Sequence, residues 1–364
     1  MKPVRARLVT SFAFELAFAF AVGACSAGGG VAPAPPTVAP PPSPPPPPPL
    51  PPPGPGPTCG AGGQRLRVHF YDVGQALAAL VDLPDGRHVL VDTGDSPVRS
   101  GCGDVCASKH RGLLDKLRAD LHGAPIDLLW ITHQHSDHIV GAPEVLGAFK
   151  VGAYVDNGKD EKKAEVRVAH RAAEEHGARV AIVDPAHAEA QLAGTSEVRI
   201  TPVVPQAWPP SCAHDANACS ILLRIDYCGS SVLFTGDAEH DEESRLPALA
   251  PVTLLQVGHH GSDTSSTPAF LSRAKPRYAV ISAGRPDEGL NADYCHPRAL
   301  VVERLTKLLG GPGQKTLRAF DGTRCARATA SEWIDAPASD RMWATERDGD
   351  VVVSTGGDGV FVRD

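Results

Sequence analysis

Four side chains of the kinds that bind metal ions lie within six consecutive residues, and these are His133, His135, Asp137 and His138. Alternate residues of an extended segment point to the same side, so His133 and His135 can bind one cation together. Asp137 and His138, at the turn into a following helix, can face a second cation. A single histidine is usually an ordinary surface or core residue, but four ligand types at this density favour a metal site.

Two other segments carry side chains of the same kinds. Asp237 ends the run Thr235-Gly236-Asp237, where its two oxygens could bridge two cations, although a Gly-Asp pair alone is a common turn. His259 and His260 lie between glycines, which let a backbone come close to a ligand. Each of the three segments directly follows an apolar run. We therefore expect all of them at the edge of a sheet, where strands end in polar loops.

The hydrophobic pattern predicts alternating strands and helices that position these motifs. Pro84-Asp85-Gly86 predicts a hairpin turn near the start of the folded part. The alternation favours an α/β fold, with helices covering two half-sheets, while residues 318–340 look like an insertion before the final strands of 342–362. We expect strands at residues 66–72, 76–82, 88–92, 126–131, 151–155, 220–226, 231–235, 252–257 and 278–282, and helices near 111–119, after His138, and at 161–176, 241–246, 268–273 and 297–308.

Together with shorter motifs, this pattern resembles the metallo-β-lactamase superfamily and, within it, the hydrolase domain of ComEC-type DNA-uptake competence proteins, here as a stand-alone exported form. The histidine motif is specific to the superfamily, and two segments, Tyr71-Asp72-Val73-Gly74-Gln75 and His259-His260-Gly261-Ser262, narrow the resemblance to this branch. The resemblance spans nearly all of residues 66–350 and implies an α/β, four-layered αββα metallo-β-lactamase sandwich with metals at one edge. The other matching segments are Leu90-Val91-Asp92-Thr93-Gly94, Asn217-Ala218-Cys219-Ser220, Gly236-Asp237, Asn291 and His296-Pro297.

The resemblance also implies which residues bind metal. One or two divalent ions would be held, with zinc the first choice and manganese or iron as alternatives. Asp237 would bridge the two ions, and either His259 or His260 would complete the second site, a choice that the sequence leaves open. The other ligands would be His133 and His135 at the first site and Asp137 and His138 at the second.

One motif of the superfamily is missing. There is no Gly-His-[Ser/Thr]-Pro-Gly segment, and Asn217-Ala218-Cys219-Ser220 occupies that region. The first site therefore lacks one protein ligand or uses the nearby His214, and occupancy by a single ion stays open. Asn217 is expected to support a ligand or to contact substrate. Asp92 would orient the histidine loop from behind, as carboxylates next to metal-binding histidines often do.

The implied chemistry is hydrolysis by a metal-activated water. A bound divalent ion lowers the pKa of its water towards 7 and polarises the scissile group. Asp137 is expected to orient the nucleophile, and His296 to bind substrate or protonate the leaving group. Ser262 and Asn291 are expected to contact substrate. For His296, Ser262 and Asn291 the alternative role is a helix cap or a loop hydrogen bond.

The favoured function is a metal-dependent phosphodiesterase, either a nuclease or an enzyme acting on small diesters. A first alternative is hydrolysis of β-lactams, esters or amides by the same fold, which Asp237 in place of a cysteine disfavours. A second alternative is a surface-tethered binding protein without turnover, which the complete cluster of histidines disfavours.

The N-terminal part predicts export. Residues 1–25 carry three basic residues followed by an apolar run, as in a secretory signal peptide. Val22-Gly23-Ala24-Cys25 resembles a bacterial lipobox, which predicts a lipoprotein anchored to the membrane through Cys25 and facing the periplasm or cell surface. An ordinary cleaved signal is the alternative. Residues 26–64 form a linker with seventeen prolines in positions 32–57, expected as extended polyproline II. Residues 65–364 form the hydrolase domain.

Charge and cysteine content agree with this interpretation. The formal net charge is −7, and it becomes −9 without residues 1–25. We therefore expect no strong general affinity for nucleic acid, because such affinity comes mainly from lysine and arginine. Eight cysteines remain beyond Cys25, and in an oxidising compartment an even number suggests disulfides. Cys102 with Cys106 and Cys212 with Cys219 are the local candidate pairs.

Overall fold

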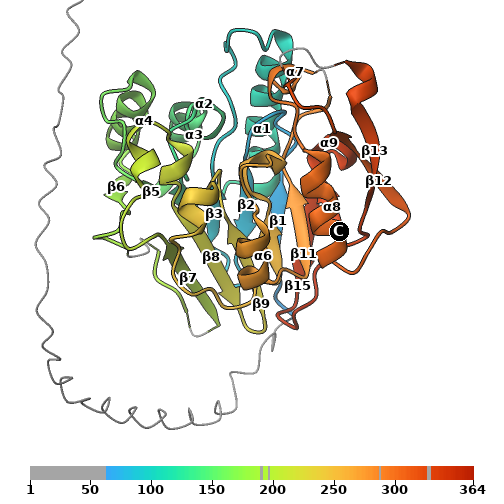
Figure 1. The fold of residues 1–364 in the computed structure, drawn as a ribbon. Helices are drawn as coiled ribbons and strands as arrows, with labels where there is room; N and C mark the ends of the chain where they lie inside the picture. Colours follow the sequence, from blue (N-terminus) through green and yellow to red (C-terminus); the bar gives the residue numbers. More distant parts are fainter. Residues whose placement is uncertain (1–62, 189–191, 196, 287, 326–328) are drawn as a thin grey trace, which may run out of the picture. The chain divides into compact units, whose positions relative to one another are not determined.

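Two β-sheets lie face to face in the computed structural model, which describes residues 63–188, 192–195, 197–286, 288–325 and 329–364 (Figure 1). The predicted signal peptide, the predicted lipid attachment at Cys25 and nearly all of the linker 26–64 lie outside these residues. Within the described ranges, no helix is both long enough and apolar enough to cross a membrane.

The first sheet has eight strands in the order β16-β15-β1-β2-β3-β4-β5-β6. Its outer strands run antiparallel, including the predicted hairpin of β2 and β3, while β3 to β6 run parallel. The parallel half places the C-terminal ends of successive strands at one edge. The bounds are β1 Leu66–Phe70, β2 Ala79–Asp82, β3 His88–Val91, β4 Ile126–Trp130, β5 Val151–Asp156, β6 Arg179–Ile182, β15 Val351–Thr355 and β16 Val362–Arg363.

The second sheet has six strands in the order β14-β11-β10-β9-β8-β7. The strands β7, β8 and β9 are antiparallel, whereas β9, β10, β11 and β14 are parallel. The bounds are β7 Val198–Val203, β8 Leu222–Tyr227, β9 Ser230–Phe234, β10 Leu254–Gln256, β11 Tyr278–Ile281 and β14 Met342–Ala344.

The main core fills the space between the two sheets. Phe70 of the first sheet packs on Phe234 of the second, with ring centroids 5.9 Å apart, and Trp130 is fully buried in the same cluster. The indole of Trp130 also donates a hydrogen bond to the carbonyl oxygen of Ile221 across the sandwich, at 2.9 Å. These contacts fix the relative position of strand ends that come from different sheets.

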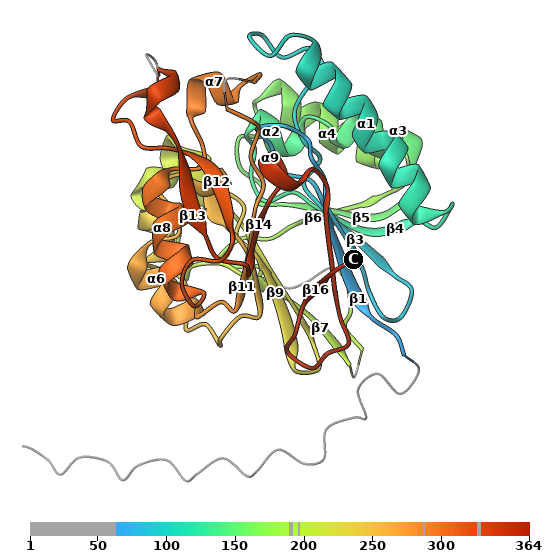
Figure 2. The same cartoon turned by 90° about the vertical axis from the view of Figure 1, so that its right-hand side faces the viewer.

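Helices cover the outer face of each sheet, so that four layers result (Figure 2). The expected αββα sandwich is thus confirmed. The helices α1 Asp104–Leu121, α3 Ala142–Ala148 and α4 Ala164–Glu175 pack on the first sheet, and α6 Pro268–Ala274 and α8 Ala299–Leu308 pack on the second. Shorter helices lie in the connections: α2 Ser136–Ile139, α5 His240–Glu243, α7 Asn291–Tyr294 and α9 Thr345–Asp348.

Two of the expected elements differ from the structure by more than a few residues. The helix expected at 111–119 extends over Asp104–Leu121, because Cys106 and His110 continue its buried face by a further two turns. The segment 318–340 is largely not an insertion, since it belongs to a β-hairpin of β12 Lys315–Phe320 and β13 Trp333–Ala338. Leu317, Ala319, Ala336 and Ala338 of this hairpin are buried in the same core as α8.

Both disulfides expected from local spacing are present, Cys102–Cys106 and Cys212–Cys219. A third one, Cys295–Cys325, links the loop after α7 to the segment between β12 and β13. Sequence separation gave no hint of this pair, because its members are 30 residues apart and meet only through the fold.

Candidate metal centre and pocket

The histidine motif occupies the loop that follows β4 and the short helix α2. The predicted helix begins earlier than expected, at Ser136, so Asp137 and His138 lie inside its single turn. His133 and His138 are fully buried, and their ring centroids lie 4.1 Å apart. His133 and His135 are also adjacent, with centroids 4.9 Å apart. The motif therefore gathers its imidazoles at the end of β4.

Asp237 comes from the other sheet, directly after β9. Gly236 makes its approach possible: its φ is 53°, and a Cβ at this position would lie 2.6 Å from the Cβ of Thr132. Only a residue without a side chain fits such a contact in this conformation. The loops that end β4 and β9 are consequently in direct contact, and the Asp237 carboxylate is buried among histidines.

The third segment turns its two imidazoles through unusual backbone angles. His259 and His260 both have positive φ, 48° and 53°, in the turn Gly258–Gly261. Such conformations are uncommon for non-glycine residues and concentrate at functional sites. His260 Nδ1 lies 2.8 Å from the carbonyl oxygen of Ser282 and so must be a donor. The lone pair of the neutral ring is then on Nε2, which lies 3.4 Å from Asp137 Oδ2 and 3.6 Å from Asp237 Oδ2.

Asp92 fixes the tautomer of His138, as the Ser282 carbonyl oxygen does for His260. Its Oδ2 lies 2.7 Å from His138 Nδ1, while both of its oxygens accept hydrogen bonds from Thr132. With Nδ1 donating to Asp92, the lone pair of a neutral His138 is on Nε2, 3.3 Å from Asp237 Oδ2. Asp92 is fully buried and thus acts from behind the ligand, the position that the family resemblance implied.

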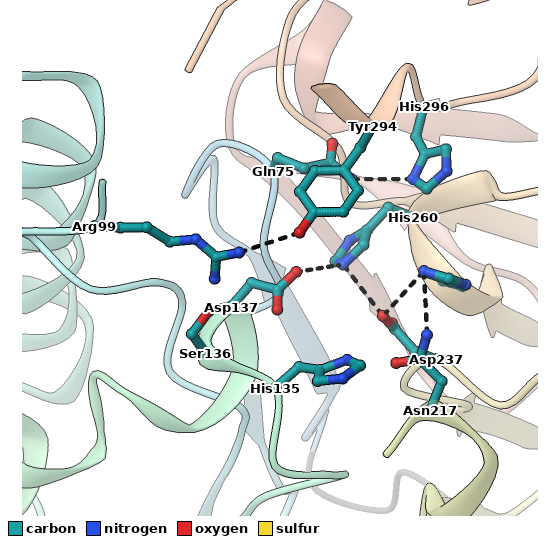
Figure 3. A pocket seen from close by; sticks show the side chains of 11 residues that line it. Gln75, Arg99, His135, Ser136, Asp137, Asn217, Asp237, His260, Tyr294 and His296 are labelled. Carbon is teal, nitrogen blue, oxygen red and sulfur yellow. Dashed lines mark hydrogen bonds and ion pairs between the residues drawn. The ribbon is translucent and has the colours of Figure 1, made fainter. Parts of the chain in front are cut away.

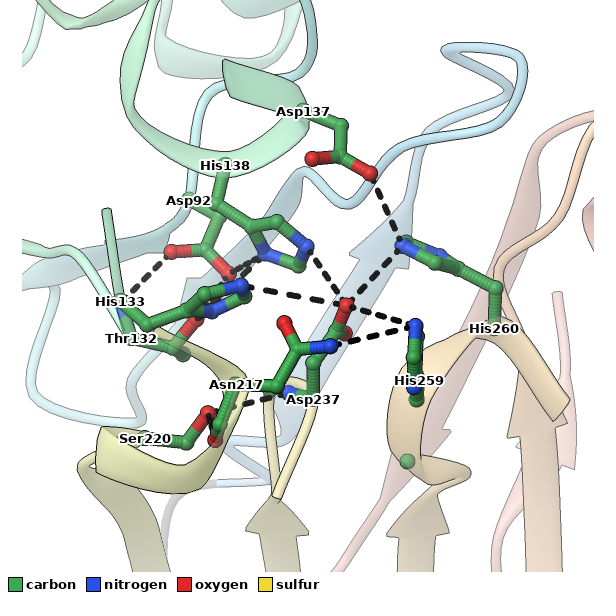
Figure 4. A network of polar contacts seen from close by, with 12 residues as sticks. Asp92, Thr132, His133, Asp137, His138, Asn217, Ser220, Asp237, His259 and His260 are labelled. Carbon is green, nitrogen blue, oxygen red and sulfur yellow. Dashed lines mark hydrogen bonds and ion pairs between the residues drawn. The ribbon is translucent and has the colours of Figure 1, made fainter. Parts of the chain in front are cut away.

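Four of these residues can bind one ion together (Figure 4). The ligand atoms of Asp137, His138, Asp237 and His260 all lie within 4.8 Å of one another. Among the described residues, His138 Nε2, His260 Nε2 and Asp237 Oδ1 are buried without any hydrogen-bond partner. Buried polar atoms normally have partners, and several orphaned ones pointing at a common centre fit a cation. The donor set of two imidazoles and two carboxylates suits zinc and also manganese or iron.

His133 lies on another side of Asp237. Its Nε2 is buried without a hydrogen-bond partner, 3.9 Å from Asp237 Oδ2. His259 is 3.8 Å from the same oxygen, but its other contacts lead away from the group of four. Its Nδ1 lies 3.1 Å from Glu239 Oε1, and its Nε2 lies 3.4 Å from Asn217 Nδ2. The geometry thus places His260 rather than His259 in the four-residue group.

The charges of the cluster are strongly coupled. Burial opposes ionisation of Asp237, but the charges of His138, His260 and His259 outweigh it and hold the pKa of Asp237 well below its usual range. Burial likewise opposes protonation of His138, yet Asp237 and Asp92 raise the pKa of His138 well above its usual range. The carboxylates therefore attract a cation to the His138 Nε2 position, and a proton and a metal ion compete for it.

Part of the cluster, Asp137, Asp237 and His260, lines a pocket of about 320 Å³ (Figure 3). Arg99 reaches across this pocket and donates a hydrogen bond to the Tyr294 hydroxyl at 3.1 Å, while its guanidinium lies 3.3 Å from Asp95. The wall facing the candidate ligands is therefore cationic and aromatic. The lining residues are Gln75, Arg99, His135, Ser136, Asp137, Asn217, Asp237, His259, His260, Tyr294 and His296.

Some residues expected in the site lie elsewhere. Ser262 forms a hydrogen bond with Thr264 in its own turn, and it does not line the pocket. Asn291 is fully buried, and it uses its amide to hold the backbone of His296 and Gly284. His214 is exposed at the end of the turn Pro210–Ala213, outside the pocket. The alternative in which His214 completes the first site does not fit this geometry.

Four pocket residues had no role in the sequence-based interpretation, and one of them, Ser136, lies inside the histidine motif. Gln75 is the last residue of the motif Tyr71-Asp72-Val73-Gly74-Gln75. This motif supported the family resemblance, but it did not indicate a chemical role for the Gln75 side chain. Arg99 lies in a loop without periodicity, three residues before Cys102, and Tyr294 directly precedes Cys295. The nearby cysteines are the only sequence signal for these two positions, and they indicate loop anchoring without indicating a pocket.

The sequence also matches a known protein family. Residues 71–285 match the family described as the metallo-beta-lactamase superfamily. The match covers more than half of the chain, which therefore belongs to the metallo-β-lactamase superfamily. All the residues of the candidate metal centre lie inside the matched segment, whereas Tyr294 and His296 lie beyond it.

Three curated proteins are similar in sequence to this chain. Recombination protein 2 of Haemophilus influenzae is 29% identical over 243 residues, covering 66% of this chain and 26% of that protein. ComE operon protein 3 of Bacillus subtilis is 29% identical over 256 residues, covering 66% of this chain and 30% of that protein. Competence protein ComA of Neisseria gonorrhoeae is 26% identical over 242 residues, covering 65% and 29% respectively. This chain thus spans less than a third of each relative.

Among solved structures, the chain is similar to CmlA, described as a diiron beta-hydroxylase from Streptomyces venezuelae. The two are 14% identical, with a TM-score of 0.41 over 68% of this chain and 52% of that chain. This likeness is too distant to bear on activity.

Proposed function

We propose that this chain is an exported, metal-dependent phosphodiesterase. The observation that carries the proposal is the environment of Asp237. One of its carboxylate oxygens lies 3.3 to 3.9 Å from imidazole nitrogens of four histidines, in a pocket whose opposite wall bears Arg99. A carboxylate so placed suits a site for two cations, an arrangement that recurs in phosphatases and nucleases.

The ligand assignment follows the geometry. Asp137, His138, Asp237 and His260 would hold one ion, and His133 and His135 would hold a second next to Asp237. When bound, the ions supply a Lewis acid and activate water for attack on the ester. Asn217 takes the place of the missing third-motif histidine, and its Oδ1, buried and without a hydrogen-bond partner, is available to that second ion.

The protein side chains contribute recognition as well as ligands. Arg99 provides a fixed positive charge for a substrate anion, because Asp95 and Tyr294 hold its guanidinium in place. Arginine is suited to phosphate, whose oxygens match its planar donors. Asp137 lines the pocket, so its carboxylate can also orient the attacking water.

The substrate is proposed to be a phosphodiester in nucleic acid or in a small molecule. The names of the relatives, a recombination protein and competence proteins, support nucleic acid. The net charge of −7 supports a small diester or a short strand end over tight binding along a polymer. Attachment to the membrane through a lipid on Cys25, facing the periplasm or cell surface, is part of the proposal, as the N-terminal pattern suggests.

The test is a comparison of substrates and variants. The purified chain, loaded with zinc or manganese, is assayed on bis-p-nitrophenyl phosphate, plasmid DNA and nitrocefin, with and without chelator. We expect phosphodiester turnover that chelator abolishes and that His138→Ala lowers by at least about 10³-fold. His214→Ala is the matched control and should keep full activity.

Two results would contradict the proposed function. Turnover of nitrocefin without phosphodiester turnover would point to β-lactam hydrolysis, and retained metal without turnover of any substrate would point to a binding protein.

A further inference from the structure

We infer that Gln75 is a positioning residue that fixes the tautomer of His296, so that His296 presents Nε2–H to the pocket as a hydrogen-bond donor. Gln75 lies in the loop between β1 and β2, far from His296 in the sequence. Its side chain reaches the pocket wall, where one end of its amide contacts His296 (Figure 3) and the other end contacts the backbone of Gly284. These two contacts together settle which atom donates in each of the two hydrogen bonds.

The first contact fixes the orientation of the amide. Gln75 Oε1 lies 3.2 Å from the backbone nitrogen of Gly284. A backbone N–H can only donate, so the atom facing it must be the carbonyl oxygen of the side chain. The orientation of a glutamine amide, which is often ambiguous, is therefore determined here by its partner.

The second contact then fixes the imidazole. The other end of the Gln75 amide is its NH2 group, 3.1 Å from His296 Nδ1. An amide NH2 can only donate, so Nδ1 must accept. A neutral imidazole that accepts at one nitrogen carries its proton on the other. His296 consequently has its hydrogen on Nε2.

The free nitrogen faces the pocket. His296 is 6% exposed and lines the cavity, and its ring lies 5.3 Å from that of His259 and 6.5 Å from that of His260. Among the described residues, the Nε2 atom of His296 has no hydrogen-bond partner. This atom is also not fully buried. An N–H group there can reach only the pocket contents.

The surrounding backbone makes this arrangement rigid. Asn291 accepts a hydrogen bond from the His296 nitrogen at 2.8 Å and donates to the carbonyl oxygens of His296 and Gly284 at 2.6 and 2.7 Å. Gly284 lies so close to Gln75 that a Cβ would be 2.9 Å from the Gln75 backbone nitrogen. Asn291 thus links His296 and Gly284, the two partners of the Gln75 amide. This structural role explains why Asn291 is buried and does not line the pocket.

The consequence concerns the proposed reaction, on which this role rests. With Nδ1 occupied and Nε2 protonated, His296 cannot accept a proton from water, and it acts by donating a hydrogen bond. A phosphoryl oxygen that gains negative charge is the partner such a donor favours. His296 therefore stabilises substrate charge beside the candidate metal centre, and Gln75 acts on the reaction only through His296.

The tautomer can be measured without any substrate. Long-range proton–nitrogen NMR correlation on the full chain, zinc-loaded and with labelled histidine, distinguishes the two neutral tautomers, and His296→Gln assigns the signals. We expect the Nε2–H form in the wild type. In Gln75→Glu the carboxylate can only accept, so a proton should move to Nδ1. The matched control Gln314→Glu, at an exposed position, should leave the His296 signals unchanged.

Kinetics of the same variants supply the second readout. On bis-p-nitrophenyl phosphate we expect kcat to fall roughly 10²- to 10³-fold in Gln75→Glu, the loss typical of one misplaced donor, with a smaller change in KM. Gln75→Met, which keeps the shape but removes both hydrogen bonds, should also lower kcat.

An Nδ1–H tautomer in the wild type would overturn the inference, and so would an unchanged tautomer in Gln75→Glu. The wild-type spectrum decides even if a variant fails to fold. It also decides if phosphodiesters are not the substrate, so failure of the proposed function is separable from failure of this inference.

Discussion

Asp237 brings the polar atoms of the site to one point. Its carboxylate contacts histidines from two different loops, and three of the unpaired buried nitrogens lie around it. The neighbouring histidines are held from behind, His138 by Asp92 and His260 by the Ser282 carbonyl. Each of these supports selects a tautomer with a lone pair on Nε2, which is the form that binds a metal.

A first prediction at this scale concerns Asp92. Its φ is 56°, a conformation that asparagine tolerates well, so Asp92→Asn removes charge with little backbone change. The amide can donate to His138 Nδ1 and thereby disturb the ligand tautomer. We expect metal affinity to fall about 10- to 100-fold, measured by competition with a chromophoric chelator. Asp115→Asn, on the exposed face of α1, is the control, and equal affinity of both variants would contradict the role of Asp92.

A second prediction concerns Arg99. Removing its charge in Arg99→Gln should lower kcat/KM for bis-p-nitrophenyl phosphate by roughly 10- to 100-fold, the effect expected for one hydrogen bond to a charged group. Hydrolysis of a neutral ester such as p-nitrophenyl acetate should change little. Arg118→Gln, whose partner Asp115 is at the surface, serves as the control. Equal losses on charged and neutral substrates would show that Arg99 supports the fold and does not recognise an anion.

At the scale of elements, the site depends on how closely the loops after β4 and β9 approach. Gly236→Ala should place a methyl group 2.6 Å from Thr132 and destabilise the chain by about 1–3 kcal/mol, with loss of bound metal. Gly177→Ala is a matched control, because Gly177 also has positive φ, but a methyl group there would have no heavy atom within 4 Å. Urea unfolding of both variants separates the steric clash from the backbone penalty. Equal destabilisation would show that the close approach has no special weight.

The same elements explain what the sequence could predict. The His133–His138 motif, Asp237 and His259–His260 each follow an apolar strand, so their place at a sheet edge was visible from pattern alone. The choice between His259 and His260 was not, because it depends on two successive positive φ angles that non-glycine residues rarely adopt. Arg99 and Tyr294 were not predicted either, since the loop of Arg99 and the single-turn helix α7 of Tyr294 show no periodicity and meet only through tertiary structure. The hairpin β12–β13 was misjudged because its two strands are joined by residues 321–332, a connection much longer than the two to five residues of an ordinary hairpin loop.

At the scale of the whole molecule, several buried carboxylates make stability depend on pH. Burial raises the pKa of Glu346 to about 7, against 4.5 for the exposed group. Between these values the folded chain holds a proton that the unfolded chain has lost. Stability from this group is therefore greatest below pH 4.5 and is lost as pH rises through about 7.

This gives a prediction for Glu346→Gln. The variant lacks the titrating group. The free energy of unfolding of the variant minus that of the wild type should therefore increase by about 1–3 kcal/mol from acidic to mildly alkaline pH. Urea unfolding with chelator present, at pH values on either side of the titration, measures the difference. A constant difference between the two proteins at all pH values would show that Glu346 keeps an ordinary pKa in the folded chain.

The sandwich as a whole serves to bring loops from two sheets to one edge, and we expect this edge to bind a divalent metal ion. Anomalous X-ray diffraction from crystals of the full chain grown with zinc tests it most directly. A strong peak is expected among Asp137, His138, Asp237 and His260, and this peak should disappear in Asp237→Ala. A well-ordered pocket without any peak at this position, or zinc bound only elsewhere on the chain, would contradict it.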